Sequence, residues 1–360
     1  MTGHEPSSHQ DDVHGHRMQQ RVSDLVAEAL VRGEWDAVRD LAQQWADGPH
    51  SSPCASFVLN VVALLQGDFA AAWKLHAKAL QTPQDIETVR TWIDEIENRY
   101  PPEGHLRLIR GLFLAQSGQS QQSLPAYEEA ARLLPRSPYP HFFMAQIYQR
   151  MGRSDQAIKA YRQAVKLDPS YVAARLNLGV AYQEQGQLEM AIPQYRELIK
   201  LRPTDPLGHS NLACALAEQG KLEAAIEEYK EALKLNPNDA EVRFALGGVY
   251  EQKGRRDLAL REYEEALRLA PDFGPAATAV GWILFDRGQV DAALDAFSKA
   301  LKANPQDASA IFGVGRVYDK KRKPEMAAAH YRQALELEKD SAKKTAILNF
   351  IDKVVGGYHE

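Results

Sequence analysis

The chain has 360 residues, of which 44% are apolar and 25% charged, as in an ordinary globular protein. Its net charge is −5, so the chain lacks the excess of basic residues that is typical of nucleic-acid-binding proteins. It has only two cysteines, Cys54 and Cys214, which are too few for a disulfide framework. The most apolar run, residues 57–65, is too short to cross a bilayer, and the N-terminal segment has no apolar core of a secretory signal. We therefore expect a cytoplasmic protein that neither inserts into a membrane nor binds nucleic acid.

Residues 1–19 are polar throughout and are predicted to form a disordered tail. The tail contains four histidines, which are His4, His9, His14 and His16. Histidine-rich tracts can bind metal, but these residues are irregularly spaced. We favour a disordered end over a metal site and expect no metal ligands in the chain.

Residues 20–82 are predicted to form two degenerate helical hairpins, because Gly33 and Gly67 lie 34 residues apart, each before a helix-like run. The next spacing, from Gly67 to Gly118, is one and a half times as long. We assign the extra half to a linker helix within residues 83–103.

Seven regular repeats of 34 residues follow, over residues 104–341, and begin at residues 104, 138, 172, 206, 240, 274 and 308. In each repeat, position 8 is glycine or alanine, position 20 is alanine or serine, and position 24 is aromatic. The first six repeats have glycine at position 15 and proline at position 32. The glycines are Gly118, Gly152, Gly186, Gly220, Gly254 and Gly288.

This pattern predicts a pair of amphipathic helices in every repeat. Apolar residues recur at three- and four-residue spacing on both sides of the glycine, and the small residues allow the two helices to approach closely. One hairpin cannot bury its own apolar faces, so neighbouring hairpins must stack. We expect residues 342–355 to form a helix that caps the last repeat, followed by a short tail at 356–360.

The repeated positions resemble the tetratricopeptide repeat, whose pattern is W-x2-L-G-x2-Y, then A-x3-F, then P. The resemblance implies an all-α fold, a right-handed α-solenoid of stacked hairpins. The tryptophan of the pattern, at position 4, is absent from every repeat. Histidine or arginine stands there in repeats 2 to 5, as His141, Arg175, His209 and Arg243.

No motif for catalysis is present. The chain lacks G-x-S-x-G, a Walker glycine loop, H-E-x-x-H and paired C-x-x-C. Its many glutamates lie on helices at charge-pair spacing from lysine and arginine, which is typical of solvated outer faces. We expect a non-enzymatic protein with no catalytic residues and no cofactor.

In stacked repeats of the family that the sequence resembles, the first helices line a concave groove, mainly through positions 2, 5, 9 and 12. The resemblance therefore implies exposed groove residues, many of them apolar or aromatic, that bind a peptide or an amphipathic helix of a partner protein. The candidates are Tyr139, Phe142, Gln146, Leu176, Asn177, Val180, Asn211, Phe244, Trp282, Phe285, Phe312 and Arg316. Among them, we expect Phe244, Trp282 and Phe312 to form one patch. Alternatively, these side chains pack on the neighbouring repeat or on the N-terminal segment of the chain.

Two binding modes of the family can be compared with the sequence. No three consecutive repeats contain the complete set of lysine, asparagine and arginine residues of the carboxylate clamp that grips the C-terminal carboxylate of heat-shock chaperones. An asparagine ladder at position 6 has only two members, Asn177 and Asn211. The sequence thus predicts a protein–protein interaction scaffold or adaptor. A regulatory or assembly subunit that positions a separate enzyme or envelope machine remains the alternative, and self-association is possible.

Overall fold

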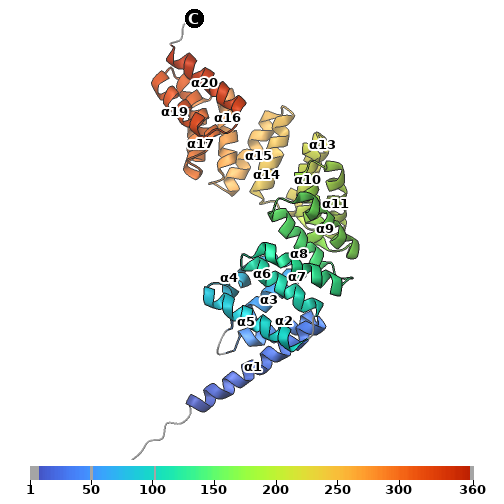
Figure 1. Ribbon diagram of the computed structural model, residues 1–360. Helices are drawn as coiled ribbons and strands as arrows, with labels where there is room; N and C mark the ends of the chain where they lie inside the picture. Colours follow the sequence, from blue (N-terminus) through green and yellow to red (C-terminus); the bar gives the residue numbers. More distant parts are fainter. Residues whose placement is uncertain (1–7, 49–51, 101–102, 357–360) are drawn as a thin grey trace, which may run out of the picture. The chain divides into compact units, whose positions relative to one another are not determined.

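The computed structural model describes the backbone of residues 8–48, 52–100 and 103–356, and their side chains except those of 8–19 and 69. Every regular element within these ranges is an α-helix, as the all-α prediction requires (Figure 1). The chain divides into two compact units, residues 1–194 and 195–360, and the boundary falls within helix α11, Leu188–Leu201.

The N-terminal unit contains the two degenerate hairpins, the linker helix and the first regular repeats. Its helices are α1 (Ser8–Arg32), α2 (Trp35–Ala46), α3 (Pro53–Gln66), α4 (Phe69–Ala79), α5 (Pro83–Arg99), α6 (Gly104–Gln116), α7 (Ser120–Leu133), α8 (Tyr139–Arg150), α9 (Ser154–Leu167) and α10 (Val172–Glu184). Consecutive helices contact each other as antiparallel pairs, α1 with α2, α3 with α4, α6 with α7 and α8 with α9.

The C-terminal unit contains four more complete hairpins and a final single helix. Its helices are α12 (Pro206–Glu218), α13 (Leu222–Leu235), α14 (Ala240–Gln252), α15 (Arg256–Leu269), α16 (Gly274–Asp286), α17 (Val290–Ala303), α18 (Ala308–Lys320), α19 (Pro324–Leu337) and α20 (Ser341–Val355). Each hairpin of this unit contacts the next one along the chain.

The N-terminal tail differs from the prediction. Helix α1 begins at Ser8, so residues 8–19, which were expected to be disordered, continue the helix that packs from residue 20 onward. This stretch contains no proline, and a helix propagates at low cost once a packed segment has nucleated it. Residues 1–7 and the side chains of His9, His14 and His16 lie outside the described part of the chain.

The repeat pattern has a direct steric cause. An added Cβ at Gly247 would lie 2.5 Å from the Tyr263 ring, and one at Gly281 would lie 2.6 Å from the Phe297 ring. The small residue at position 8 therefore makes room for the ring at position 24 of the same hairpin. Both rings are buried, and this contact is the centre of each hairpin.

The missing tryptophan at position 4 is replaced by polar contacts. Arg243 donates to the Pro237 carbonyl at the end of the preceding repeat and pairs with Glu262 in its own second helix, at 3.1 Å. Arg175 makes the same link to the carbonyl of Pro169, at 2.6 Å. A guanidinium has enough donors for both partners, so one side chain joins two repeats where the family pattern uses an aromatic ring.

The last helix, α20, covers the final hairpin. Ile347 and Val354 are buried in a cluster that includes Tyr331, and Phe350 packs against it. Leu348 and Val355, two further apolar residues of this helix, are 46% and 60% exposed. The helix is therefore rotated so that Phe350, rather than these two residues, completes the covered face.

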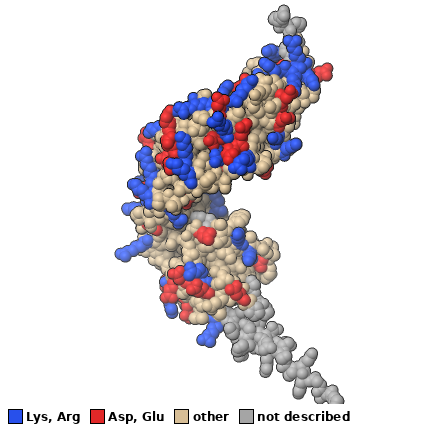
Figure 2. Space-filling view, turned by 180° about the vertical axis from the view of Figure 1, so that it is seen from behind, with Lys and Arg blue, Asp and Glu red and all other residues tan. Residues whose placement is uncertain are grey.

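Opposite charges connect consecutive repeats along the outer surface. Position 14 of one repeat pairs with position 18 of the repeat before it, as Lys253 with Glu223, Arg287 with Asp257, and Lys321 with Asp291. Figure 2 shows basic and acidic side chains interspersed on one face of the molecule. The acidic side chain of each pair is at least 80% exposed, so each pair adds little to the free energy of unfolding. The pairs act mainly by favouring the register in which consecutive repeats stack.

Candidate functional site

The structure separates the predicted groove residues into buried and accessible ones. Phe142 is fully buried, with ring centroids 5.9 Å from Tyr161 and 4.9 Å from Tyr171. Its assignment as an exposed groove residue is therefore wrong. The reason is that its ring, at position 5, is covered by the rings at positions 24 and 34 of its own repeat.

Phe244 follows the same packing rule. Its ring lies 5.4 Å from Tyr263 and 5.2 Å from Phe273, which hold positions 24 and 34 of its repeat. It is half-buried. Phe244 thus packs within its own repeat. Its ring contacts do not include Trp282 or Phe312, with which it was expected to form one patch.

Trp282 and Phe312 do come together, with ring centroids 5.9 Å apart. Phe285 lies beside Trp282, and the Arg316 guanidinium lies 5.2 Å from the centre of the Phe285 ring and 4.5 Å from that of Phe350. Because Phe350 belongs to α20, the final helix already covers part of this cluster. Cation–π and ring contacts hold it together, so its members are structural as well as partly accessible.

The remaining candidates are half-buried. Tyr139 packs edge-on against Tyr171, and burial raises the pKa of Tyr139. Asn211 donates to the Leu207 carbonyl of its own helix at 2.8 Å, which uses one of its amide hydrogens locally. Leu176 and Val180 lie on α10, as does Asn177, which faces a cavity in the N-terminal unit.

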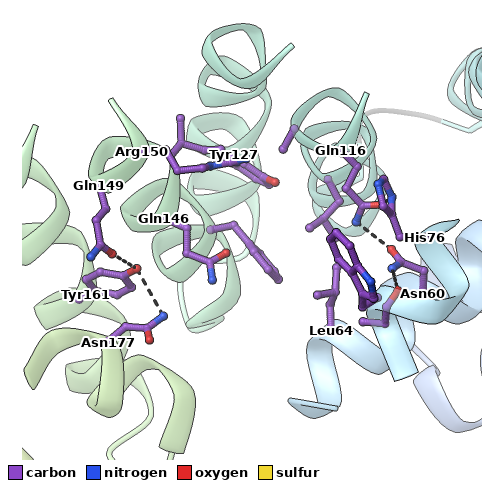
Figure 3. Close-up of a pocket in the computed structure, with 16 residues that line it drawn as sticks. Asn60, Leu64, His76, Gln116, Tyr127, Gln146, Gln149, Arg150, Tyr161 and Asn177 are labelled. Carbon is purple, nitrogen blue, oxygen red and sulfur yellow. Dashed lines mark hydrogen bonds between the residues drawn. The ribbon is translucent and has the colours of Figure 1, made fainter. Parts of the chain in front are cut away.

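That cavity has a volume of about 600 Å³ and is the candidate functional site (Figure 3). Its lining comes from helices of both the degenerate hairpins and the regular repeats. The lining residues are Asn60, Leu64, Ala72, Trp73, His76, Leu112, Ala115, Gln116, Tyr127, Phe143, Gln146, Ile147, Gln149, Arg150, Tyr161 and Asn177. A site of this size accepts several side chains of a ligand.

One end of the cavity is a hydrogen-bonded network between α3, α4 and α6. The buried Asn60 donates to the Ala72 carbonyl at 2.6 Å and accepts from Gln116 at 2.7 Å. Gln116 in turn pairs through its carbonyl oxygen with His76 Nδ1, at 3.2 Å. These contacts hold the Gln116 carboxamide in one orientation at the cavity wall.

The other end is a second network on α8, α9 and α10. The Tyr161 hydroxyl donates to Gln149 at 3.1 Å and accepts from Asn177 at 3.4 Å, while Gln149 donates to Glu184 at 3.0 Å. Burial raises the pKa of Tyr161, so the hydroxyl stays protonated at neutral pH. The hydrogen bond from its amide nitrogen orients the Asn177 side chain, and its carbonyl oxygen takes no part in this network.

Between the two networks lie Tyr127, Gln146 and Arg150 (Figure 3). The Tyr127 ring stacks on Phe143, with centroids 5.9 Å apart and an interplanar angle of 20°. In other repeats the tyrosine at position 24 bonds to position 12, as Tyr263 does to Glu251 at 2.9 Å. Position 12 of the first repeat is Ala115, which offers no such side chain.

Trp73 stands at the rim of the cavity and is 74% exposed. Its ring centroid lies 6.1 Å from that of His76. Sequence reasoning missed Trp73, His76, Gln116 and Arg150, because it sought the groove at four positions of the regular repeats. A tryptophan in the small-residue run that opens α4 was the one available signal.

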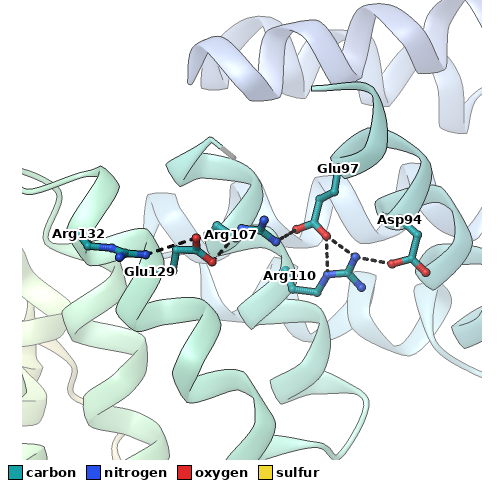
Figure 4. Close-up of polar contacts among 6 residues, drawn as sticks. All are labelled: Asp94, Glu97, Arg107, Arg110, Glu129 and Arg132. Carbon is teal, nitrogen blue, oxygen red and sulfur yellow. Dashed lines mark hydrogen bonds and ion pairs between the residues drawn. The ribbon is translucent and has the colours of Figure 1, made fainter. Parts of the chain in front are cut away.

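The position of α6, which carries Gln116 and Leu112, is set by ion pairs with its neighbours (Figure 4). Arg110 pairs with both Asp94 and Glu97 of α5. Arg107 pairs with Glu97 at 3.0 Å and with Glu129 of α7 at 3.0 Å. Glu97 is only 14% exposed and serves two arginines, so it is the centre of this network.

Other kinds of site are not found in the described residues. They contain no group of three or more histidines, cysteines or carboxylates that could hold a metal ion. The helices that were searched are too short or too polar to cross a bilayer. Cys54 is buried, burial raises the pKa of its thiol to about 12, and Cys214 lies near Glu218 on its own helix.

Three family models match the sequence. The model described as "TPR repeat" matches residues 214–254, and two models described as "Tetratricopeptide repeat" match residues 144–206 with 279–342, and residues 240–273. Together they cover just over half of the chain. No curated protein matches the sequence significantly.

Solved structures with a similar fold are numerous. PilF of Pseudomonas aeruginosa is 22% identical, with a TM-score of 0.52 over 59% of this chain and 96% of that one. Yeast Tom70 is 12% identical, with a TM-score of 0.52 over 95% and 96%. The chain is also 30% identical to MamA over 46% of its length and 96% of that protein, with a TM-score of 0.42.

Proposed function

Because the chain belongs to the tetratricopeptide-repeat family, we propose that it is a non-enzymatic protein-interaction scaffold that binds an extended peptide segment in the cavity of its N-terminal unit. The observation that carries this proposal is the row of carboxamides, Gln116, Gln146 and Asn177, along the cavity. Each carboxamide offers both a donor and an acceptor.

An extended segment suits this row better than a helix does. The backbone N–H and C=O groups of a helix are already paired internally, whereas those of an extended chain need partners. Trp73 supplies a large exposed ring at the rim for an apolar side chain of the peptide. The two networks that orient Gln116 and Asn177 reduce the entropy lost on binding.

Selection of binders from a library of displayed random short peptides, with the full chain as the target, tests this proposal. Peptides selected by the wild-type protein are expected to bind Trp73→Ala about thirtyfold more weakly, as an interface anchor would. Asn177→Ala should cost about three- to tenfold, the value of one neutral hydrogen bond.

Asn211→Ala is the matched control. It removes the same residue type from the same position of the next repeat, where the amide bonds to its own helix. Equal losses for Asn177→Ala and Asn211→Ala, or selected peptides indifferent to Trp73→Ala, would place the binding surface outside the cavity. If the wild-type protein selects no peptide, the proposed function itself fails.

A further inference from the structure

The middle of the cavity contains three polar groups that the protein itself leaves without a partner. Among the described residues, none makes a hydrogen bond or ion pair with the Tyr127 hydroxyl, the Gln146 carboxamide or the Arg150 guanidinium. The Tyr127 ring is buried, Gln146 is half-buried and Arg150 is exposed, and all three line the cavity. Because the protein does not use these groups itself, a ligand in the cavity can form hydrogen bonds with all three.

All three groups can donate hydrogen bonds, and Arg150 adds a positive charge. Arg150 is close enough to Tyr127 and to Tyr161 for its charge to lower the pKa of both hydroxyls, although burial outweighs this effect and raises both. Among the described lining residues there is no aspartate or glutamate. Glu184, which accepts from Gln149, lies outside the lining. The centre of the cavity is thus a cationic, donor-rich spot with an apolar floor made by Phe143.

The residue that could pair with Arg150 from the repeat before is uncharged. Arg150 holds position 13 of its repeat, and in one later pair of repeats position 13 pairs with position 17 of the repeat before, where Asp286 binds Arg256 at 3.1 Å. Position 17 of the first repeat is Ser120, which carries no charge. Ser120 therefore offers Arg150 no ion pair.

We propose, building on the proposed function, that Tyr127 and Arg150 recognise the carboxylate of an aspartate or glutamate side chain within the bound peptide. A carboxylate accepts from a hydroxyl and a guanidinium at once, and charge-assisted hydrogen bonds are the strong ones. Gln146 is placed to donate to the same group or to the adjoining peptide backbone.

The carboxylate belongs to a side chain rather than to the end of a peptide. Carboxamides lie on both sides of the Tyr127–Arg150 pair, with Gln116 on one side and Asn177 on the other (Figure 3). A backbone that uses both must continue past the pair in each direction. The acidic residue is therefore internal to the segment.

The first test uses the displayed peptides that are selected for binding to the full chain. We expect aspartate or glutamate at one position of the selected sequences. Binding of the best peptide, measured by fluorescence polarisation, should fall about tenfold or more in Arg150→Gln and in Tyr127→Phe. Changing the acidic residue to its amide should cause a similar loss, and that loss should vanish in the Arg150→Gln background.

Two controls separate the sources of an effect. Arg153→Gln removes an exposed arginine that is outside the lining and should leave affinity unchanged. A peptide with an amidated C-terminus should bind as well as the free acid, and a loss on amidation would show that a chain end is recognised instead.

The second test needs no ligand. Tyr127→Phe removes a hydroxyl that has no intramolecular partner, so the thermal stability of the free protein should be unchanged or slightly higher. A clear loss of stability would mean that the hydroxyl is already paired, and would overturn the site. Selected peptides that depend on Trp73 but lack acidic residues, or that ignore Arg150→Gln, would overturn this inference while leaving the proposed function intact.

Discussion

At the scale of single residues, the turn between the two helices of each repeat requires a left-handed backbone. The six glycines at position 15 have φ between 69° and 84°. The seventh repeat has Arg322 at this position, with φ of 56°, and it is the one non-glycine residue with positive φ in the described chain. A side chain in this conformation costs about 1–2 kcal/mol because Cβ crowds the backbone.

Arg322→Gly should therefore stabilise the protein, by about 1 kcal/mol or less. The relief of strain exceeds the extra conformational entropy that glycine gives the unfolded chain, which is about 0.5–1 kcal/mol. Chemical denaturation monitored by circular dichroism measures the difference. Arg322→Ala keeps the Cβ and should show no such gain, so equal stability of the two variants would contradict the argument.

A second residue-scale effect is a pH dependence. Burial lowers the pKa of His105 below its ordinary value of 6.5, and the ring packs edge-on against Trp35, with centroids 5.5 Å apart. As pH falls below 6.5, the unfolded chain binds a proton that the folded chain does not, so stability is lost in this range.

His105→Phe keeps a ring against Trp35 but cannot be protonated. The loss of stability on acidification should be smaller in this variant than in the wild type, as measured by thermal melts across the range below pH 6.5. Other titrating groups are common to both proteins and cancel in the comparison. Identical slopes would show that His105 is protonated equally well in both states.

At the scale of elements, the linker helix α5 is attached by polar contacts as well as by its apolar face. Trp92 donates to Ser23 of α1 at 2.9 Å, while Glu97 binds Arg107 and Arg110 of α6. The repeat period cannot place α5, because it has no partner helix of its own. Specific side-chain contacts determine where it lies, and through α6 they also position Gln116 in the cavity.

Glu97→Gln should destabilise the N-terminal unit by about 1–3 kcal/mol, because it leaves two largely buried arginines with weakened partners. Hydrogen exchange should rise first in α5 and α6. Arg132→Gln, at the 76% exposed end of the same network, should change stability by no more than about 0.5 kcal/mol. Equal effects of the two substitutions would mean that the network adds nothing beyond surface pairing.

At the scale of the whole molecule, stability is distributed among repeats that contact mainly their neighbours. Each of the two compact units has its own buried clusters, such as that around Phe297 in the C-terminal unit. Such arrays unfold locally, and a defect in one repeat spreads through its interfaces. The midpoint of one melting curve is then not a complete description of stability.

Gly281→Leu places a branched side chain against Phe297 and should cost about 1–3 kcal/mol by overpacking. Hydrogen exchange should rise in α16 to α19 and remain unchanged in α3 to α8. Gly281→Ala is the milder control, because Ala145 and Ala213 hold the same position in other repeats. A uniform rise in exchange across the chain would show that the molecule unfolds as one cooperative body.

Sequence alone determined the hairpins, since their residues interact at fixed short separations. The small residue at position 8 contacts the ring at position 24, and the glycine at position 15 forms the turn between their helices, so the period reveals them directly. Gln146 and Asn177, two of the residues predicted to bind a partner, line the cavity, and their role in binding stays a prediction.

Only the tertiary structure decided which of the other candidates are accessible and where the cavity lies. Phe142 is buried because Tyr171, at the end of its repeat, folds back over it, a contact that Phe244 and Phe273 repeat but that the family pattern does not include. Asn60 and Trp73 reach the cavity from α3 and α4, respectively, whose sequences lack the regular pattern. The Tyr127 hydroxyl has no partner among the described residues because position 12 of the first repeat is alanine. The proposed carboxylate site also needs Arg150, which belongs to the next repeat. A repeat pattern records the contacts that all repeats share, whereas a binding site arises where one repeat departs from them.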